Sequence, residues 1–212
     1  MTESPLPRRI EITTAVLLSL AGLTSAWASY QAALWGGIQA SHYARASAKV
    51  TEASRLSIVD GQAVGTDTAM FLGWLNAAAD GDEKRMIFFE RHFSPEMSVM
   101  FVPWRAALPE DVRTAELKDG PVPPMPRTMH AEGNSAKALQ KAADAEFIEG
   151  DRANDIGDRY VATTVVLSTV LFLGGISPIL RRDSMRMAML VLAGLLGAVA
   201  AGFIVNFPVA GL

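Results

Sequence analysis

The densest group of residues that could do chemistry is a run of acids near the middle of the second half of the chain. Its members are Asp144, Glu146, Glu149, Asp151, Asp155 and Asp158. The last three are spaced i, i+4 and i+7, so they share one face of a helix, and carboxylate oxygens are the ligands that hard divalent cations prefer. Arg152 and Arg159 are interleaved with them, and Asp155 with Arg159 forms an i, i+4 pair. A solvated, salt-bridged face accounts for this pattern, and we predict no metal site.

The other residue types that usually carry chemistry form no recognisable constellation in this sequence. His42, His92 and His130 are far apart, with no second histidine at ligand spacing, and the chain has no cysteine. It also lacks a phosphate-binding glycine loop, a nucleophile-elbow serine and a paired catalytic carboxylate pattern. We therefore predict no catalytic residue and no cofactor, although an enzyme with an unfamiliar motif stays open.

Three tracts without any Asp, Glu, Lys or Arg set the organisation of the chain. They run from Ile12 to Ala44, from Tyr160 to Leu180 and from Met187 to Leu212. Each can cover the roughly 20 residues that a membrane-spanning helix needs. The sequence thus predicts an integral membrane protein with three spans, and it shows no charged group inside them for coupled transport.

Positive charge predicts the orientation of these spans. Arg8 and Arg9 precede the first span, and the short loop between the second and third holds Arg181, Arg182 and Arg186 against one acid, Asp183. Lys and Arg in short loops stay on the cytoplasmic side. The predicted segments are a cytoplasmic N-terminus at 1–11, spans at 12–35, 159–180 and 187–206, an extracytoplasmic helical domain at 36–158, a cytoplasmic loop at 181–186 and an extracytoplasmic C-terminus at 207–212.

The composition of the middle segment agrees with an extracytoplasmic location. Residues 36–158 hold 13 lysines and arginines and 19 acids, a net charge of −6. This charge argues against nucleic acid as a partner. One alternative concerns processing, because Arg8, Arg9, an apolar run and the small-x-small site Ala26–Ala28 resemble a cleavable secretory signal. Cleavage there would leave Ser29 as the N-terminus.

Helix signals divide the middle segment. We expect the first helix to end near Asp60 and Gly61, further helices near residues 64–79 and 82–93, and mainly loop from Pro95 to Arg127. A helix beginning at Asn134 or Ser135 should continue for about 45 residues into the second span. Its Gly150 and Gly157 should face the helix that leaves the first span, giving an antiparallel stalk.

Small residues repeat along two of the spans. They are Ala21, Ser25, Ser29, Ala33 and Gly37 in the first and Gly194, Ala198 and Gly202 in the third. In lipid such rows permit close backbone approach. We expect them to form an intramolecular seam or a homo-oligomer interface, with a water-lined pore as the remaining alternative.

Large apolar residues gather at two further places. Trp27, Tyr30, Trp35 and Tyr160 lie where the first two spans should leave the hydrocarbon, which predicts an aromatic belt at the membrane interface. Between positions 88 and 104 the candidate partner surface comprises Phe88, Phe89, Phe93, Phe101 and Trp104. The alternatives for this second group are the core of the small domain or a membrane-surface contact.

One span with ASYQAALWGGIQ at its outer end, a helical insert and two further spans joined by a basic turn resemble a family of small bacterial inner-membrane proteins of unknown function. The resemblance implies fold and location and supplies no catalytic residue. We expect an all-α protein whose extracytoplasmic domain is built on extensions of spans one and two. As function we expect a non-enzymatic structural or accessory subunit that binds a partner or self-associates in the bilayer, with a homo-oligomeric channel as the alternative.

Overall fold

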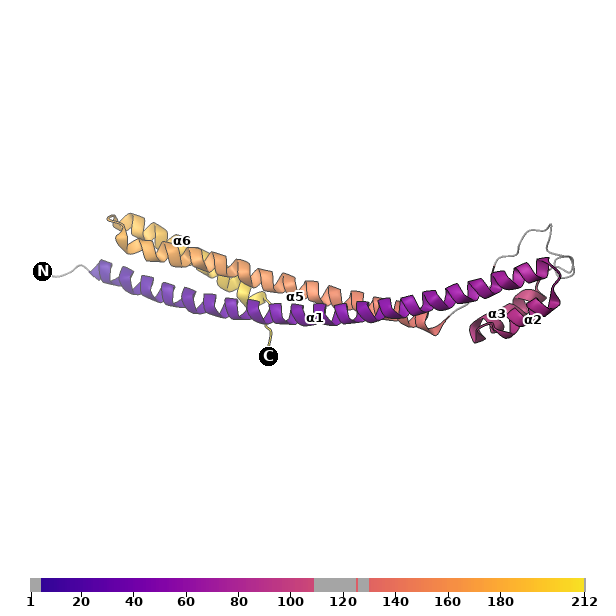
Figure 1. The fold of residues 1–212 in the computed structure, drawn as a ribbon. Helices are drawn as coiled ribbons and strands as arrows, with labels where there is room; N and C mark the ends of the chain where they lie inside the picture. The colour runs from indigo at the N-terminus through magenta and orange to yellow at the C-terminus, as the bar shows by residue number, and fades with distance from the viewer. Residues whose placement is uncertain (1–4, 109–124, 126–129, 212) are drawn as a thin grey trace. The chain divides into compact units, whose positions relative to one another are not determined.

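The computed structural model describes residues 5–108, 125 and 130–211, and side chains from Ile10 onward. Within these ranges the chain forms five α-helices, one short 3₁₀-helix and no strand (Figure 1). In chain order they are α1 (Pro5–Ala79), α2 (Glu83–Arg91), α3 (Pro95–Ala106), α5 (Ala131–Ile176), η1 (Ser177–Ile179) and α6 (Asp183–Asn206). The expected all-α class is confirmed.

Helix α1 is a single element of 75 residues, so the predicted break near Asp60 and the separate helix at 64–79 are wrong. The break was inferred from Gly61, and a glycine inside a helix costs only about 1 kcal/mol relative to alanine. No proline interrupts the backbone hydrogen bonds between Pro7 and the end of the helix. Helix propensity therefore tolerates Gly61 and Gly65 without a stop.

Helix α3 occupies 12 residues of the segment that we expected to be mainly loop. Pro95 stands at the start of this helix, where its missing N–H is not needed. The Ser94 side chain caps it by accepting a hydrogen bond from the Met97 amide at 3.0 Å. Pro103 lies inside the helix, and the burial of Met97 and Phe101 offsets its cost. The rest of the predicted loop, except Ala107, Leu108 and Met125, lies outside the described residues.

Helix α5 has 46 residues and begins at Ala131, three residues before the expected cap at Asn134. It continues without interruption into the apolar tract, as predicted. After η1 the chain turns sharply, and Arg186 fixes the turn by donating to the carbonyl oxygens of Leu180 at 2.8 Å and Pro178 at 2.7 Å. This hydrogen bonding ties the start of α6 to the end of α5.

Three of the helices are long and apolar enough to cross a membrane. The candidate segments are Ile10–Ala79, Ala131–Ile179 and Asp183–Asn206. They contain the three predicted spans except for Leu180 at the end of the second, so a membrane protein is indicated by length and composition.

The chain divides into two compact units. Unit 1 comprises residues 1–45 and 145–212, and unit 2 comprises residues 46–144. In unit 1 the first part of α1, the second part of α5 and α6 lie side by side (Figure 1). Its buried cluster is built mainly from small and aliphatic side chains, namely Ala21, Leu167, Val170, Ala193 and Ala200.

Close approach between α1 and α5 in unit 1 depends on glycine. A Cβ on Gly150 would collide with the ring of Tyr43, and one on Gly174 would lie 2.6 Å from Leu18 Cδ2. At Gly157 a Cβ would lie 3.7 Å from the carbonyl oxygen of Ala32. Gly150 and Gly157 therefore face α1, the contact that the stalk prediction required.

Unit 2 has a different kind of core. The end of α1 packs against α2 and α3 through a cluster of mainly aromatic residues: Phe71, Trp74, Phe93, Met97 and Phe101. The Trp74 ring meets Phe101 edge-on with centroids 5.0 Å apart. Such edge-to-face pairs add to the stabilisation from burial. The core lies beside an open pocket that α2 and α3 line.

Candidate functional site

Helices α2 and α3 place several polar side chains next to the core of unit 2. Gly81, with φ of +71°, turns the chain after α1, and the Asp82 side chain accepts from the Arg85 amide at 3.1 Å to begin α2. A second hydrogen bond, donated by Arg85 Nε at 2.7 Å, lowers the pKa of the Asp82 carboxyl. These caps fix where α2 begins and so which face carries Glu90.

Glu90 is the polar centre of this region. Its Oε1 accepts from Trp74 Nε1 at 2.8 Å and from Arg105 Nη1 at 2.7 Å. The Arg105 guanidinium also lies over the Trp74 ring, 5.6 Å from its centroid. One carboxylate oxygen thus joins α1, α2 and α3.

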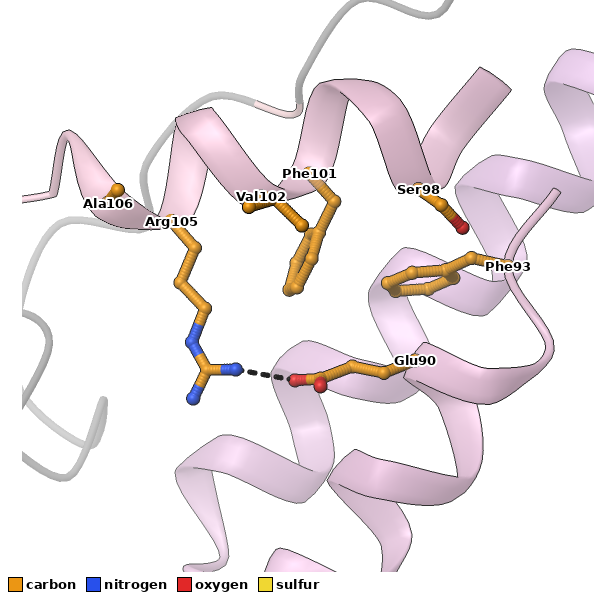
Figure 2. A pocket seen from close by; sticks show the side chains of 7 residues that line it. All are labelled: Glu90, Phe93, Ser98, Phe101, Val102, Arg105 and Ala106. Atoms are coloured by element: carbon orange, nitrogen blue, oxygen red, sulfur yellow. Dashed lines mark hydrogen bonds and ion pairs between the residues drawn. The ribbon is translucent and has the colours of Figure 1, made fainter. Parts of the chain in front are cut away.

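A pocket of about 430 Å³ opens beside this ion pair. Its lining residues are Glu90, Phe93, Ser98, Phe101, Val102, Arg105 and Ala106. Figure 2 shows the Glu90–Arg105 bond closing one side, with the Phe101 ring extending from α3 toward it. The pocket therefore combines an apolar wall with a neutralised pair of charges, which suits a small amphiphilic group or a protruding side chain.

The pocket's own hydroxyl is committed to the backbone. Ser98 Oγ donates to the Ser94 carbonyl oxygen at 2.9 Å. The nearby His92 places Nδ1 2.7 Å from the Phe88 carbonyl oxygen, so it is engaged within its own helix. Both side chains thus have backbone acceptors in their own helices or the adjoining caps.

The predicted partner surface is divided between core and exterior. Phe93 and Phe101 are buried in the unit 2 core, and Phe89 and Trp104 pack against it. Phe88 is 54% exposed. Burial takes Phe93 and Phe101 out of reach of a partner, because a small helical unit needs large side chains to fill its interior. Val102, which the apolar segment between positions 88 and 104 includes, is 69% exposed, and Val99, which was not singled out from the sequence, is 72% exposed.

The predicted small-residue rows lie mostly on the outside of unit 1. Ala21 is buried and Ser25 and Gly194 are half-buried, whereas Ser29, Ala33, Gly37, Ala198 and Gly202 are exposed. The actual seam of α6 uses Ala193, Gly197 and Ala200. A continuous i, i+4 row drifts around a straight helix of 3.6 residues per turn, so it leaves any one neighbour after a few turns.

The predicted aromatic belt also separates into two groups. Trp27 and Tyr30 are 44% and 56% exposed, as a membrane-interface role requires. Tyr160 is fully buried and does not face lipid in this fold. Its hydroxyl donates to the Pro208 carbonyl oxygen at 3.1 Å, and Trp35 Nε1 donates to the same oxygen at 3.2 Å.

These two bonds belong to a polar clamp on the C-terminal segment that the sequence analysis missed. Gln31, fully buried, accepts from the Ala210 amide at 2.8 Å and donates to the Ala210 carbonyl oxygen at 3.4 Å. Gln31 is the only glutamine in the predicted span 12–35, and this was the available signal, because a buried amide needs hydrogen-bond partners. The clamp holds residues 207–211 against α1 and α5.

Two histidines acquire partners that spacing could not reveal. His130 Nε2 lies 3.2 Å from Asp67 Oδ2, and both side chains are at most 5% exposed. His42 Nδ1 lies 2.7 Å from Glu146 Oε2, which Arg45 also approaches at 3.4 Å. Both pairs join α1 to residues more than 60 positions away, so they are tertiary contacts.

The acidic run is dispersed among separate partners. Asp151 accepts from the Tyr43 hydroxyl at 2.5 Å, and this hydrogen bond raises the pKa of Tyr43. Asp158 accepts from the Asn154 amide at 3.1 Å. Asp155 and Arg159 form no ion pair, contrary to the i, i+4 expectation. Among the described residues, no three acids or histidines gather as a metal site.

Comparisons of the chain with protein-family models, with curated proteins and with solved structures return no match. The resemblance to the inner-membrane family stays a prediction.

Proposed function

We propose that this protein is a non-enzymatic membrane subunit that self-associates through its membrane helices and presents unit 2 to a protein partner. One observation carries the first part of this proposal. The small-residue faces of α1 and α6 project away from the three-helix packing, and a Cβ on Gly37, Gly194 or Gly202 would meet no other atom within 4 Å.

Such faces are suited to a second copy of the chain. In lipid the apolar surface itself gives little driving force, and helix association depends on close packing. Side chains at Ser29, Ala33 and Ala198 are exposed and small, so another helix backbone can approach them closely. Large apolar residues would face lipid equally well. The presence of small residues on two exposed faces therefore favours close approach of another helix.

The mass of the purified protein in mild detergent tests self-association. We expect a complex whose mass is a multiple of the 22.7 kDa chain. Ala33→Leu and Ala198→Leu should reduce that mass, while Val16→Leu, a change at a 52% exposed position elsewhere on α1, should leave it unchanged. A parent protein that is monomeric at all concentrations would overturn the proposal.

The proposed partner site on unit 2 is the exposed side of α3 next to the Glu90–Arg105 pocket. Val99 and Val102, exposed at 72% and 69%, place apolar surface there beside the buried aromatic core. A partner that copurifies with the parent should be lost from a Val99→Asp/Val102→Asp variant of unchanged stability. Ile58→Asp, at a 63% exposed position on α1, is the matched control. Equal retention by both variants would exclude this surface.

The proposed location is the bacterial inner membrane, with the N-terminus and the 181–186 turn in the cytoplasm and residues 36–158 in the periplasm. Charge asymmetry supports this orientation. Because the chain has no cysteine, Ser57→Cys and Ser184→Cys provide single labels at exposed positions. A membrane-impermeant maleimide added to sealed right-side-out vesicles should label the first and spare the second. The reverse pattern would invert the topology.

A further inference from the structure

A groove in unit 1 lies between α5 and the end of α6. Its volume is about 360 Å³, and its lining residues are Arg159, Ala162, Thr163, Val166, Phe203 and Phe207. All except Arg159 belong to the charge-free tracts. The groove therefore begins where the second apolar tract begins and continues along it.

The walls of the groove present almost no polar group. The Thr163 hydroxyl is committed to the Arg159 carbonyl oxygen at 2.9 Å. Phe203 and Phe207 have ring planes 7° apart and centroids 6.1 Å apart, and both give aromatic surface to the α6 side of the groove. A hydrocarbon chain matches this surface, because it has no polar group that would be left without a hydrogen bond.

Arg159 supplies a cation at one end. It is exposed and has no ion-pair partner among the described residues. Side chains on a helix lean toward its N-terminus, which directs this guanidinium away from the apolar tract. A guanidinium can donate two parallel hydrogen bonds to a phosphate.

Asp155, which is exposed and lies outside the groove lining, places an anion one turn further from the apolar tract. Four residues separate it from Arg159, so the two lie on the same face about 6 Å apart along the helix axis. The order along α5 is thus apolar groove, cation, anion. The other nearby acid, Asp158, lies about a quarter turn around the helix from Arg159 and accepts a hydrogen bond from Asn154.

We propose that this groove binds one phospholipid whose head group carries a primary ammonium, as in phosphatidylethanolamine. The acyl chain lies along Ala162, Val166 and Phe203, the phosphate contacts Arg159, and the ammonium contacts Asp155. This sequence of groups is the one in which such a lipid crosses the membrane interface. The inference goes beyond the proposed function and depends only on membrane insertion.

Selectivity must come from the head group. Lipid tails are as apolar as the groove, so exchanging one acyl chain for another gains little. Arg159 alone would favour any phospholipid, and most strongly an anionic one. Asp155 reverses that preference, since it repels a second negative charge and attracts an ammonium.

Native mass spectrometry of the delipidated full chain, with dioleoyl phosphatidylethanolamine or dioleoyl phosphatidylglycerol added, tests the site. The ethanolamine lipid should form more of the one-lipid adduct. Arg159→Gln should weaken its apparent affinity roughly tenfold. Asp155→Asn should invert the order of the two lipids. Arg152→Gln and Asp158→Asn make the same charge changes on other faces of α5 and should preserve the order.

A further variant distinguishes the contribution of acyl-chain contacts in the groove to lipid binding from that of the head-group contacts. Ala162→Phe adds volume at an exposed position in the groove wall without changing charge, so it should weaken both lipids equally. Equal adducts of the two lipids on the parent protein would overturn the proposal. So would an Arg159→Gln variant that binds the ethanolamine lipid as the parent does.

Discussion

The two units of this protein bury opposite kinds of side chain. Unit 1 is held by alanine, glycine and aliphatic residues, with Ala193 and Ala200 fully buried in its central cluster. Unit 2 is held by aromatic residues around Trp74 and Phe101. The difference follows from the expected solvent. In lipid, burial of a large apolar side chain gains little and close packing dominates, whereas in water the area removed from solvent dominates.

The largest effect expected from this comparison is the loss of an aromatic ring from unit 2. Phe101 is 4% exposed and contacts Trp74, Phe93 and Trp104. Phe101→Ala should lower the free energy of unfolding of unit 2 by about 3–5 kcal/mol. Denaturant titration followed by near-ultraviolet circular dichroism measures it. Val102→Ala, at a 69% exposed neighbour, should change stability by less than about 0.5 kcal/mol. Similar losses for both would show that the aromatic cluster is not the core.

The converse change in unit 1 is the addition of volume. Gly150→Leu should drive a side chain into Tyr43 and cost about 1–3 kcal/mol through overpacking. Thermal unfolding in detergent, followed by far-ultraviolet circular dichroism, measures the expected decrease in melting temperature. Gly61→Leu is the control, because a Cβ there meets no atom within 4 Å and leucine favours a helix. If Gly150→Leu is as stable as Gly61→Leu, the close seam between α1 and α5 is absent.

Unit 1 also depends on a buried polar contact with the C-terminal segment. Gln31→Leu keeps the side-chain volume but leaves the Ala210 amide without its acceptor, at a cost of about 1–3 kcal/mol. Hydrogen exchange at Ala210 should accelerate accordingly. The exposed Gln62 offers the same substitution without a buried partner, and Gln62→Leu should leave Ala210 protected. Unchanged exchange in Gln31→Leu would mean that the clamp does not form.

The smallest expected effect is that low pH weakens the Asp82 cap at the start of α2 in unit 2. The hydrogen bond from Arg85 lowers the pKa of Asp82 below its ordinary value of 3.8. As pH falls, the Asp82 carboxyl is therefore protonated at a higher pH in the unfolded chain than in the folded one. The cap stabilises the fold fully above the ordinary pKa, and this stabilisation is lost as pH falls through the folded pKa. Exchange at the Arg85 amide, corrected for intrinsic rate, should increase over that acidic range. Asp82→Asn should remove this pH dependence, and its persistence would assign the effect to another acid.

The sequence was sufficient for the large divisions of the molecule. Long tracts without charge identify helices that can cross a membrane, because an unpaired charge in hydrocarbon is costly wherever the helices pack. Capping residues and the positions of prolines predicted α2 and the long course of α5, because both act on backbone hydrogen bonds close to them in the sequence. They were less reliable at Gly61, where a glycine costs only about 1 kcal/mol, and at Pro103, where the burial of Met97 and Phe101 offsets a larger cost.

Tertiary structure decided which side chains are buried and which are paired. A pattern of small residues shows that a helix face can approach another, but only the packing showed that Ala193 and Ala200 face inward while Ala198 and Gly202 remain outside. The pairing of Gln31 with Ala210 joins residues 179 positions apart. Local periodicity contains no information on such a contact, because it is set by how three helices fit together and where the chain returns.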